Sequence, residues 1–439
     1  MLSDSKAPDY HAVLKRIQLD KQPTPGAAKS DPQFGNGRID GLEQNYTEWV
    51  QKLSFTGGEG KTAYGTGFFV NIPDCEYDVM FTVAHNLVDR DKNPGQLFSD
   101  LKILAPSGNI DITPDRVRYC GTYVTATDAI EKEISDYGVI LLERTANSPL
   151  RGGFGLDVFP GMADLSKLPK DLITVNITAY PSGGDLKFSS GQLFDCTEKQ
   201  LKYSSATEQG SSGGVVWLGY EGRPVVVGIH NYGNPNRATR LNLTVLRQIF
   251  EWCGVGVHNK YIRTVGKENY LKFEGEPGED IFPMTTSDIS SNPGRFSIFP
   301  GFSSHIYPPK PPGSSAKPGT ENSYKSPKYV FAYTTDDGVY YLDFDPDEER
   351  RCCVFASTKY SPNCQLEVAI ASKKQDTASF YTSASTGFRI MKKIKTSQLA
   401  LKVYEEDIDP SDPAKQDDAG AEAVSVLRFK KDNLYLSDK

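Results

Sequence analysis

The stretch EQGSSGGVVW, residues 208–217, places Ser212 between glycines and runs directly into a β-forming segment. Glycines let the backbone turn sharply and point successive N–H groups into one concavity. Such donors can hold the oxyanion that develops when a hydroxyl attacks a carbonyl group. In isolation the stretch could equally be a flexible Gly/Ser turn, so its meaning depends on the rest of the chain.

Two further stretches place a histidine and an aspartate beside apolar strands. FTVAHNL, residues 81–87, is an apolar run that ends in a small residue and His85, and SDYGVILL, residues 135–142, puts Asp136 at the mouth of a buried run. Alone, the histidine could be structural and the aspartate could cap a turn. Together with Ser212 they give the order His, Asp, Ser, which suits nucleophilic catalysis.

These stretches resemble the trypsin-like (chymotrypsin-fold) serine peptidases, whose motifs are T-A-A-H, D-x-A-L-L and G-x-S-G-G. The resemblance spans about residues 46 to 258. It extends to three lesser landmarks, which are GTGFFV at 65–70, Tyr180-Pro181 and GIHNYG at 228–233. The resemblance implies an all-β double barrel, and Tyr180-Pro181 is similar to a turn of the glutamyl-endopeptidase branch.

The resemblance also implies a mechanism. His85 would take the hydroxyl proton of Ser212, Ser212 would attack the scissile carbonyl, and Asp136 would fix the tautomer of the imidazole. The N–H groups of Gly210 and Ser212 match the oxyanion hole of the family, and acyl transfer to water completes the reaction. By this resemblance the reaction would require no cofactor, and the substrate would be a protein or peptide.

Two departures separate this chain from the digestive and clotting members of the family. Ser211 stands where those enzymes have the aspartate that binds a newly cut N-terminus, so we expect a different form of control. Asn86 replaces the half-cystine that usually follows the catalytic histidine. The intracellular, bacterial-like branch fits the chain better.

Substrate preference is predicted from two positions of the pocket that holds the residue before the cut. By motif counting these positions are Thr207 and His230, and a hydroxyl with a histidine at these places binds glutamate in the glutamyl-endopeptidase branch. Asn231, Tyr232 and Gly233 belong to the strand that would pair with the substrate backbone. We therefore predict cleavage after Glu or Asp, the alternative being that His230 is a packed strand histidine.

Composition bounds the compartment and the partners. The 439 residues carry a net charge of -7, which argues against nucleic acid as the main partner. No run approaches the ~20 apolar residues that cross a bilayer, and the N-terminus lacks the apolar core of a secretory signal. The seven cysteines show neither the spacing of a zinc site nor that of a disulfide framework. We therefore predict no metal site and expect the cysteines to be reduced thiols. A cytoplasmic location follows, although a chain that had lost its leader would look the same.

The sequence divides into four regions. We predict an extended leader over 1–45, the protease domain over 46–260, a Pro/Gly/Ser-rich linker over 261–326 and a β-rich accessory domain over 327–439. Short apolar runs between Gly, Pro, Asn and Asp clusters favour strands throughout. Only Thr244 to Cys253 is predicted to be helical, with Gly254 as its stop signal. The accessory domain would recognise a partner or act as an inhibitory cap.

Two other functions compete with a peptidase. A catalytically inactive protease fold could serve as a binding or scaffold protein, since fold alone does not fix function. An ester hydrolase could use the same three residues, but the order His, Asp, Ser and the few helical segments do not match the α/β-hydrolase layout.

Overall fold

The structure is a computed structural model that describes residues 46–57, 60–73, 75–91, 95–105, 108–144, 152–157, 173–220 and 223–255, together with the strands given below from residue 257 onward. The chain forms two compact units, one of residues 1–254 with 303–324 and one of residues 255–302 with 325–439. The predicted leader lies outside the described residues.

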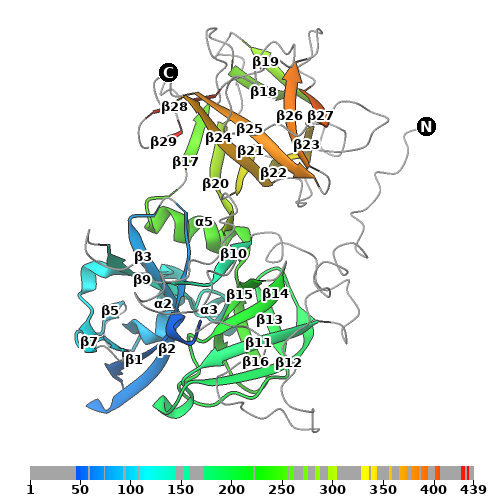
Figure 1. Cartoon of the computed structure of the whole chain (residues 1–439). Coiled ribbons are helices and arrows are strands. Elements are labelled where there is room, and N and C mark those ends of the chain that lie inside the picture. The colour runs from blue at the N-terminus through cyan, green and yellow to red at the C-terminus, as the bar shows by residue number, and fades with distance from the viewer. Residues whose placement is uncertain are drawn as a thin grey trace, which may run out of the picture. The chain divides into compact units, whose positions relative to one another are not determined.

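The first half of unit 1 is a seven-stranded antiparallel sheet, curled but not closed, with the strand order β7-β6-β1-β2-β3-β9-β8 (Figure 1, blue to cyan). Alternation along β1 buries Leu53 and Phe55 and leaves Lys52 and Ser54 only partly covered, as one face of a strand requires. The bounds are β1 Val50–Thr56, β2 Thr62–Val70, β3 Tyr77–Thr82, β6 Lys102–Ala105, β7 Gly108–Asp111, β8 Val117–Tyr119 and β9 Gly138–Glu143.

The second half of unit 1 is a closed six-stranded barrel (Figure 1, green). Antiparallel pairing runs from β11 through β12, β13, β16, β15 and β14 and returns to β11. Trp217 on β14 is 1% exposed, and the rings of Phe154 and Phe188 lie against it. The bounds are β11 Thr174–Ala179, β12 Lys187–Cys196, β13 Gln200–Tyr203, β14 Val215–Tyr220, β15 Arg223–Tyr232 and β16 Asn236–Arg240, with β10 Gly155–Asp157 parallel to β15.

Unit 1 therefore has the chymotrypsin-like double-barrel fold, and this prediction is confirmed. The predicted closing helix is α5, Leu243–Trp252, and the side chain of Asn242 caps it by accepting a hydrogen bond from the N–H of Val245 at 3.0 Å. None of the helices that the structure describes is long and apolar enough to cross a membrane.

The expectation of a single helix was wrong, because α2, Gly121–Thr125, and α3, Ala129–Ile134, lie between β8 and β9. Helices this short show too little periodicity to be recognised from apolar spacing. Asp128 does carry a local signal, since its side chain caps α3 by accepting from the N–H of Glu131 at 2.8 Å. Short elements complete unit 1, namely η1 Tyr46–Trp49, η3 Ala84–Asn86, β4 Val88–Asp89, β5 Gln96–Leu97, η4 Pro114–Arg116 and η6 Pro181–Gly183.

The described part of unit 2 consists of antiparallel strands, and the domain boundaries stay a prediction. Strands β18 to β20 lie within the range predicted to be a linker. The strands are β17 Val257–Tyr261, β18 Tyr270–Glu274, β19 Phe282–Thr286, β20 Arg295–Ser303, β21 Lys328–Thr335, β22 Gly338–Asp343, β23 Phe355–Ser357, β24 Gln365–Ser372, β25 Thr377–Ala384, β26 Gly387–Lys393, β27 Leu401–Glu405, β28 Leu427–Lys430 and β29 Asn433–Leu434.

Candidate active site

His85 and Asp136 meet because their strands are neighbours. His85 lies in η3 just after β3, Asp136 lies just before β9, and the antiparallel register pairs Thr82 with Gly138. The His85 Nδ1 atom is 2.6 Å from Oδ2 of Asp136, and the His85 backbone N–H donates to Oδ1 at 3.0 Å. Asp136 is fully buried, whereas 27% of the His85 side chain is exposed. The carboxylate thus fixes one edge of the imidazole and leaves Nε2 for the cleft.

The backbone of Ser212 is held by the first sheet. Its carbonyl oxygen accepts the N–H of Thr66 at 2.8 Å and the side-chain amide of Asn86 at 2.9 Å. Gly213 has φ +84°, and a Cβ there would lie 1.9 Å from the carbonyl oxygen of Thr66. A glycine is therefore required directly after the serine, because the backbone of another strand occupies the space of a side chain.

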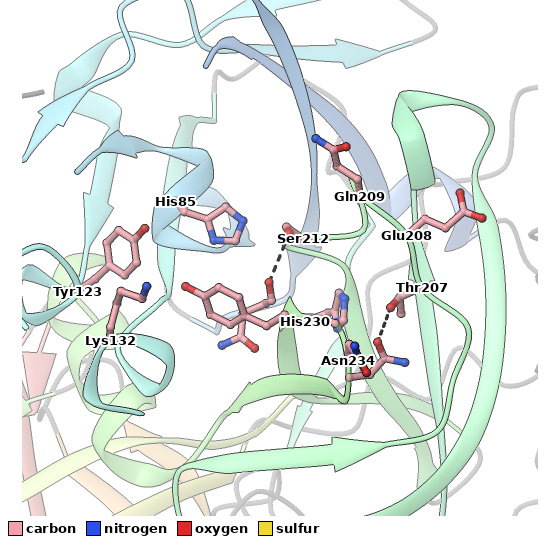
Figure 2. A pocket seen from close by; sticks show the side chains of 13 residues that line it. His85, Tyr123, Lys132, Thr207, Glu208, Gln209, Ser212, His230 and Asn234 are labelled. Carbon is pink, nitrogen blue, oxygen red and sulfur yellow. Dashed lines mark hydrogen bonds between the residues drawn. The ribbon is translucent and has the colours of Figure 1, made fainter. Parts of the chain in front are cut away.

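The hydroxyl of Ser212 donates to the carbonyl oxygen of Asn231 at 3.4 Å in this structure. Ser212 and His85 line the same cavity, and both side chains lie at its centre in Figure 2. Rotation about the Cα–Cβ bond of the serine changes the partner of its hydroxyl without moving the backbone.

Two backbone N–H groups around Ser212 stand out in the part of the chain that the structure describes. Neither Gly210 nor Ser212 donates its N–H to a backbone carbonyl there. The neighbouring N–H groups all donate to backbone carbonyl oxygens, at donor–acceptor distances of 2.7 to 3.0 Å. Ser211 donates to Glu208, Gly213 to His230 and Gly214 to Ser211. The two N–H groups left over are those predicted for the oxyanion hole.

The orientation of the peptide before Gly210 is fixed by a contact with η6. The carbonyl oxygen of Gln209 accepts the N–H of Ser182 at 2.5 Å. Because a trans peptide bond points its C=O and N–H in opposite directions, the N–H of Gly210 faces away from η6. Gly210 itself has φ +89°, which favours glycine.

Ser211 forms local hydrogen bonds within the loop that precedes Ser212. Its side chain is fully buried, and its hydroxyl oxygen accepts the N–H of Glu208 at 3.2 Å while its own N–H donates to the Glu208 carbonyl at 3.0 Å. The loop before Ser212 is therefore closed on itself, without a buried carboxylate that would need a cation.

Asn86, the residue after His85, connects the two halves of unit 1. Besides Ser212, its amide group reaches the hydroxyl of Thr82 at 3.1 Å and the carbonyl oxygen of Thr66 at 3.5 Å. Asn86 is 1% exposed, so these hydrogen bonds form away from water. From the sequence Asn86 was only an absent cysteine, and nothing in the local pattern indicates its partners.

A cavity of about 600 Å³ opens at this site (Figure 2). It brings together seven of the residues predicted from the sequence, while Asp136 lies behind His85 and Gly210 is not part of the lining. The lining consists of His85, Tyr123, Lys132, Thr207, Glu208, Gln209, Ser212, His230, Asn231, Tyr232, Gly233, Asn234 and Asn236.

His230 lies buried in this lining, 2% exposed, and has a tyrosine behind it. The Tyr203 hydroxyl is 2.7 Å from Nδ1 of His230, and burial lowers the pKa of His230 to about 3, with the charge of His85 adding to this effect. The imidazole is therefore neutral near pH 7. Thr207 donates its hydroxyl to the side-chain oxygen of Asn236. Tyr203 and Asn236 were not predicted, because only the barrel pairing of β13 with β16 brings them here.

The residues predicted to contact the substrate backbone also hold the site together. The side-chain amide of Asn231 donates to the carbonyl oxygen of Glu133 at 2.8 Å and to the hydroxyl of Thr239 at 3.1 Å. The Tyr232 ring centroid is 5.8 Å from that of His85.

Among the described residues, no three His, Cys, Asp or Glu side chains gather as a metal site would require. Cys75, Cys120, Cys196 and Cys253 are buried and form no disulfide within the described residues.

Known proteins were compared with this chain by sequence and by structure. No protein-family model matches the sequence, and no curated protein does. Solved structures do match, at low identity and TM-score. They include the protease Anisep from Arthrobacter nicotinovorans (16% identity, TM-score 0.36, 47% of this chain and 95% of that one), the thermostable serine protease AL20 from an extremophilic microorganism (15%, 0.36, 47% and 96%) and a Glu endopeptidase (16%, 0.33, 48% and 92%).

Proposed function

We propose that this chain is a serine endopeptidase with Ser212 as nucleophile, His85 as general base and Asp136 as orienting carboxylate. The observation that carries the proposal is the 2.6 Å contact between Nδ1 of His85 and a fully buried carboxylate, beside a cavity that also contains Ser212. A buried aspartate in this position accepts the Nδ1–H, so the lone pair of Nε2 is available to take a proton.

The chain's own groups then serve each step of acyl transfer. The Ser212 hydroxyl passes its proton to Nε2 of His85 as its oxygen bonds to the scissile carbonyl carbon, and the negative oxygen of the tetrahedral intermediate is held by the N–H groups of Gly210 and Ser212. The imidazolium gives the proton to the leaving amine. Water, activated by His85, hydrolyses the acyl-enzyme. Each step reuses the geometry that Asp136 fixes.

An active-site label tests this proposal against an inactive scaffold. A fluorophosphonate probe forms a covalent bond only with an activated serine, so we expect stoichiometric labelling of the folded chain and peptide mapping to Ser212. Heat-denatured protein, which lacks the contact between His85 and Asp136, serves as the control and should remain unlabelled. A folded chain that stays unlabelled while trypsin is labelled in the same tube would favour the scaffold.

We further propose that the residue before the cut is Glu or Asp, bound by His230. When Nδ1 accepts a hydrogen bond from the Tyr203 hydroxyl, the neutral imidazole carries its hydrogen on Nε2 and offers a carboxylate the donor that it requires. Thr207 and Asn236 supply further polar groups in the same cavity. The buried histidine would thus be a ligand of the substrate.

Replacing His230 by Leu is expected to lower kcat/KM for a peptide with Glu before the cut by about 10- to 100-fold, the effect of one hydrogen bond to a charged group. The matching Gln peptide should lose much less, so the ratio of kcat/KM values for Glu and Gln falls toward one. Tyr203→Phe removes only the group that orients the imidazole and should have an intermediate effect. A preference of the unmodified chain for Arg, Lys or large apolar residues before the cut would rule out this pocket assignment.

A further inference from the structure

Helix α3 places an ammonium group at the cleft. Lys132 lines the cavity with Tyr123 and Tyr232, and its Nζ atom is 6.0 Å from the Tyr232 ring centroid. The same ring is 5.8 Å from the imidazole of His85. Two tyrosine side chains and a cation therefore form one wall of the cavity next to the general base.

The charge of Lys132 is not compensated within the described residues. Lys132 is partly buried and forms no ion pair among the described residues. Glu133 is bound to Arg237 at 2.8 Å and to Gln200 at 3.1 Å, and Glu131 is exposed. An anion that reached the Lys132 side of the cavity would therefore meet a free positive charge.

The position of this charge indicates which part of a substrate it would meet. In Figure 2, Thr207 and His230 lie on one side of Ser212, and Tyr123 and Lys132 lie beyond His85 on the other. When the side chain before the cut enters the His230 side, the preceding residue of an extended peptide points the opposite way, because successive side chains of a strand alternate. The side chain of that preceding residue would then lie beside Tyr123, Tyr232 and Lys132.

We propose that Lys132, Tyr123 and Tyr232 form a second carboxylate subsite, which selects Asp or Glu at the residue immediately upstream of the one before the cut. This inference rests on the proposed endopeptidase function and extends it to a substrate with two consecutive acidic residues. The aromatic rings shield the ion pair between Lys132 and the substrate carboxylate from water on one side. This ion pair is therefore stronger than one on an open surface. We expect a preference of about three- to tenfold for an acidic over a neutral side chain at this position.

Three peptides that differ only at this position, with Asp, Asn or Lys before an invariant Glu, test the inference. Their affinities are measured by calorimetry with the Ser212→Ala variant of the full chain, and their cleavage by the unmodified chain is measured in parallel. The Asp peptide should bind about three- to tenfold more tightly than the Asn peptide, and the Lys peptide least. Lys132→Gln should remove the difference and Lys132→Glu should reverse it. Lys199→Gln, which removes an exposed charge away from the cavity, should leave it unchanged.

The two measurements separate this inference from the proposed function. Charge-dependent binding that Lys132→Gln abolishes, without cleavage by the unmodified chain, would support the subsite and overturn the peptidase. Cleavage of all three peptides at equal rates, with equal affinities, would overturn the subsite and keep the peptidase. Failure of all three peptides to bind, or a charge preference that survives Lys132→Gln, would also overturn the subsite.

Discussion

Ser212→Ala is expected to lower kcat on a cleaved peptide by a factor on the order of 10⁶, His85→Ala by about the same factor, and the double variant by no more than either. The nucleophile and its base act as one unit, because the serine is a weak nucleophile until the imidazole takes its proton. Steady-state kinetics with the three variants measures this. A residual rate above that of the uncatalysed reaction should remain, since the N–H groups of Gly210 and Ser212 are backbone atoms that survive both substitutions.

The non-additivity is the decisive part of that experiment. Ser54→Ala, a change on β1 outside the cavity, provides a control that should keep full activity, and thermal unfolding of every variant verifies the fold. If the losses of the two single variants multiply in the double variant, His85 and Ser212 act independently. The assignment of base and nucleophile would then have to be abandoned.

The contact between histidine and aspartate is the part of the site that the sequence could anticipate. His85 directly follows one apolar run and Asp136 directly precedes another, so antiparallel pairing of those runs brings the two side chains to the same edge of the sheet. The glycines around Ser212 likewise indicated a tight turn, and Gly213 proves to occupy a place where a Cβ would meet the backbone of Thr66. A local sequence pattern is enough to predict a contact when a single strand pairing brings the two residues together.

The polar surroundings of the site could not be anticipated in this way. Tyr203 comes behind His230 because the barrel closes, and Asn86 reaches the carbonyl of Ser212 because the two sheets pack against each other. Lys132 depends on a six-residue helix too short to give a periodic signal. The contacts of Tyr203 and Asn86 join residues 27 and 126 positions apart and arise from packing, so no short motif records them.

Asp136→Asn is expected to lower kcat by about 10⁴ while leaving the fold intact. The carboxylate accepts hydrogen bonds from the backbone N–H of His85 at Oδ1 and from Nδ1 of His85 at Oδ2. An amide has only one acceptor oxygen, and the fixed backbone N–H claims it. The amide NH₂ group then faces Nδ1, which must accept, so the hydrogen of the imidazole moves to Nε2. The base loses the lone pair that faces Ser212.

Asp78→Asn separates this tautomer effect from the loss of a buried charge. Asp78 is 5% exposed and pairs with Nε of Arg144 at 2.7 Å, so its replacement removes a buried carboxylate of the same sheet. We expect Asp78→Asn to lower the thermal midpoint without changing kcat, and Asp136→Asn to lower kcat without changing the affinity for a peptide substrate. Equal losses of kcat in the two variants would mean that Asp136 only stabilises the sheet. A loss confined to Asp136→Asn instead identifies the tautomer of His85 as what the buried carboxylate controls.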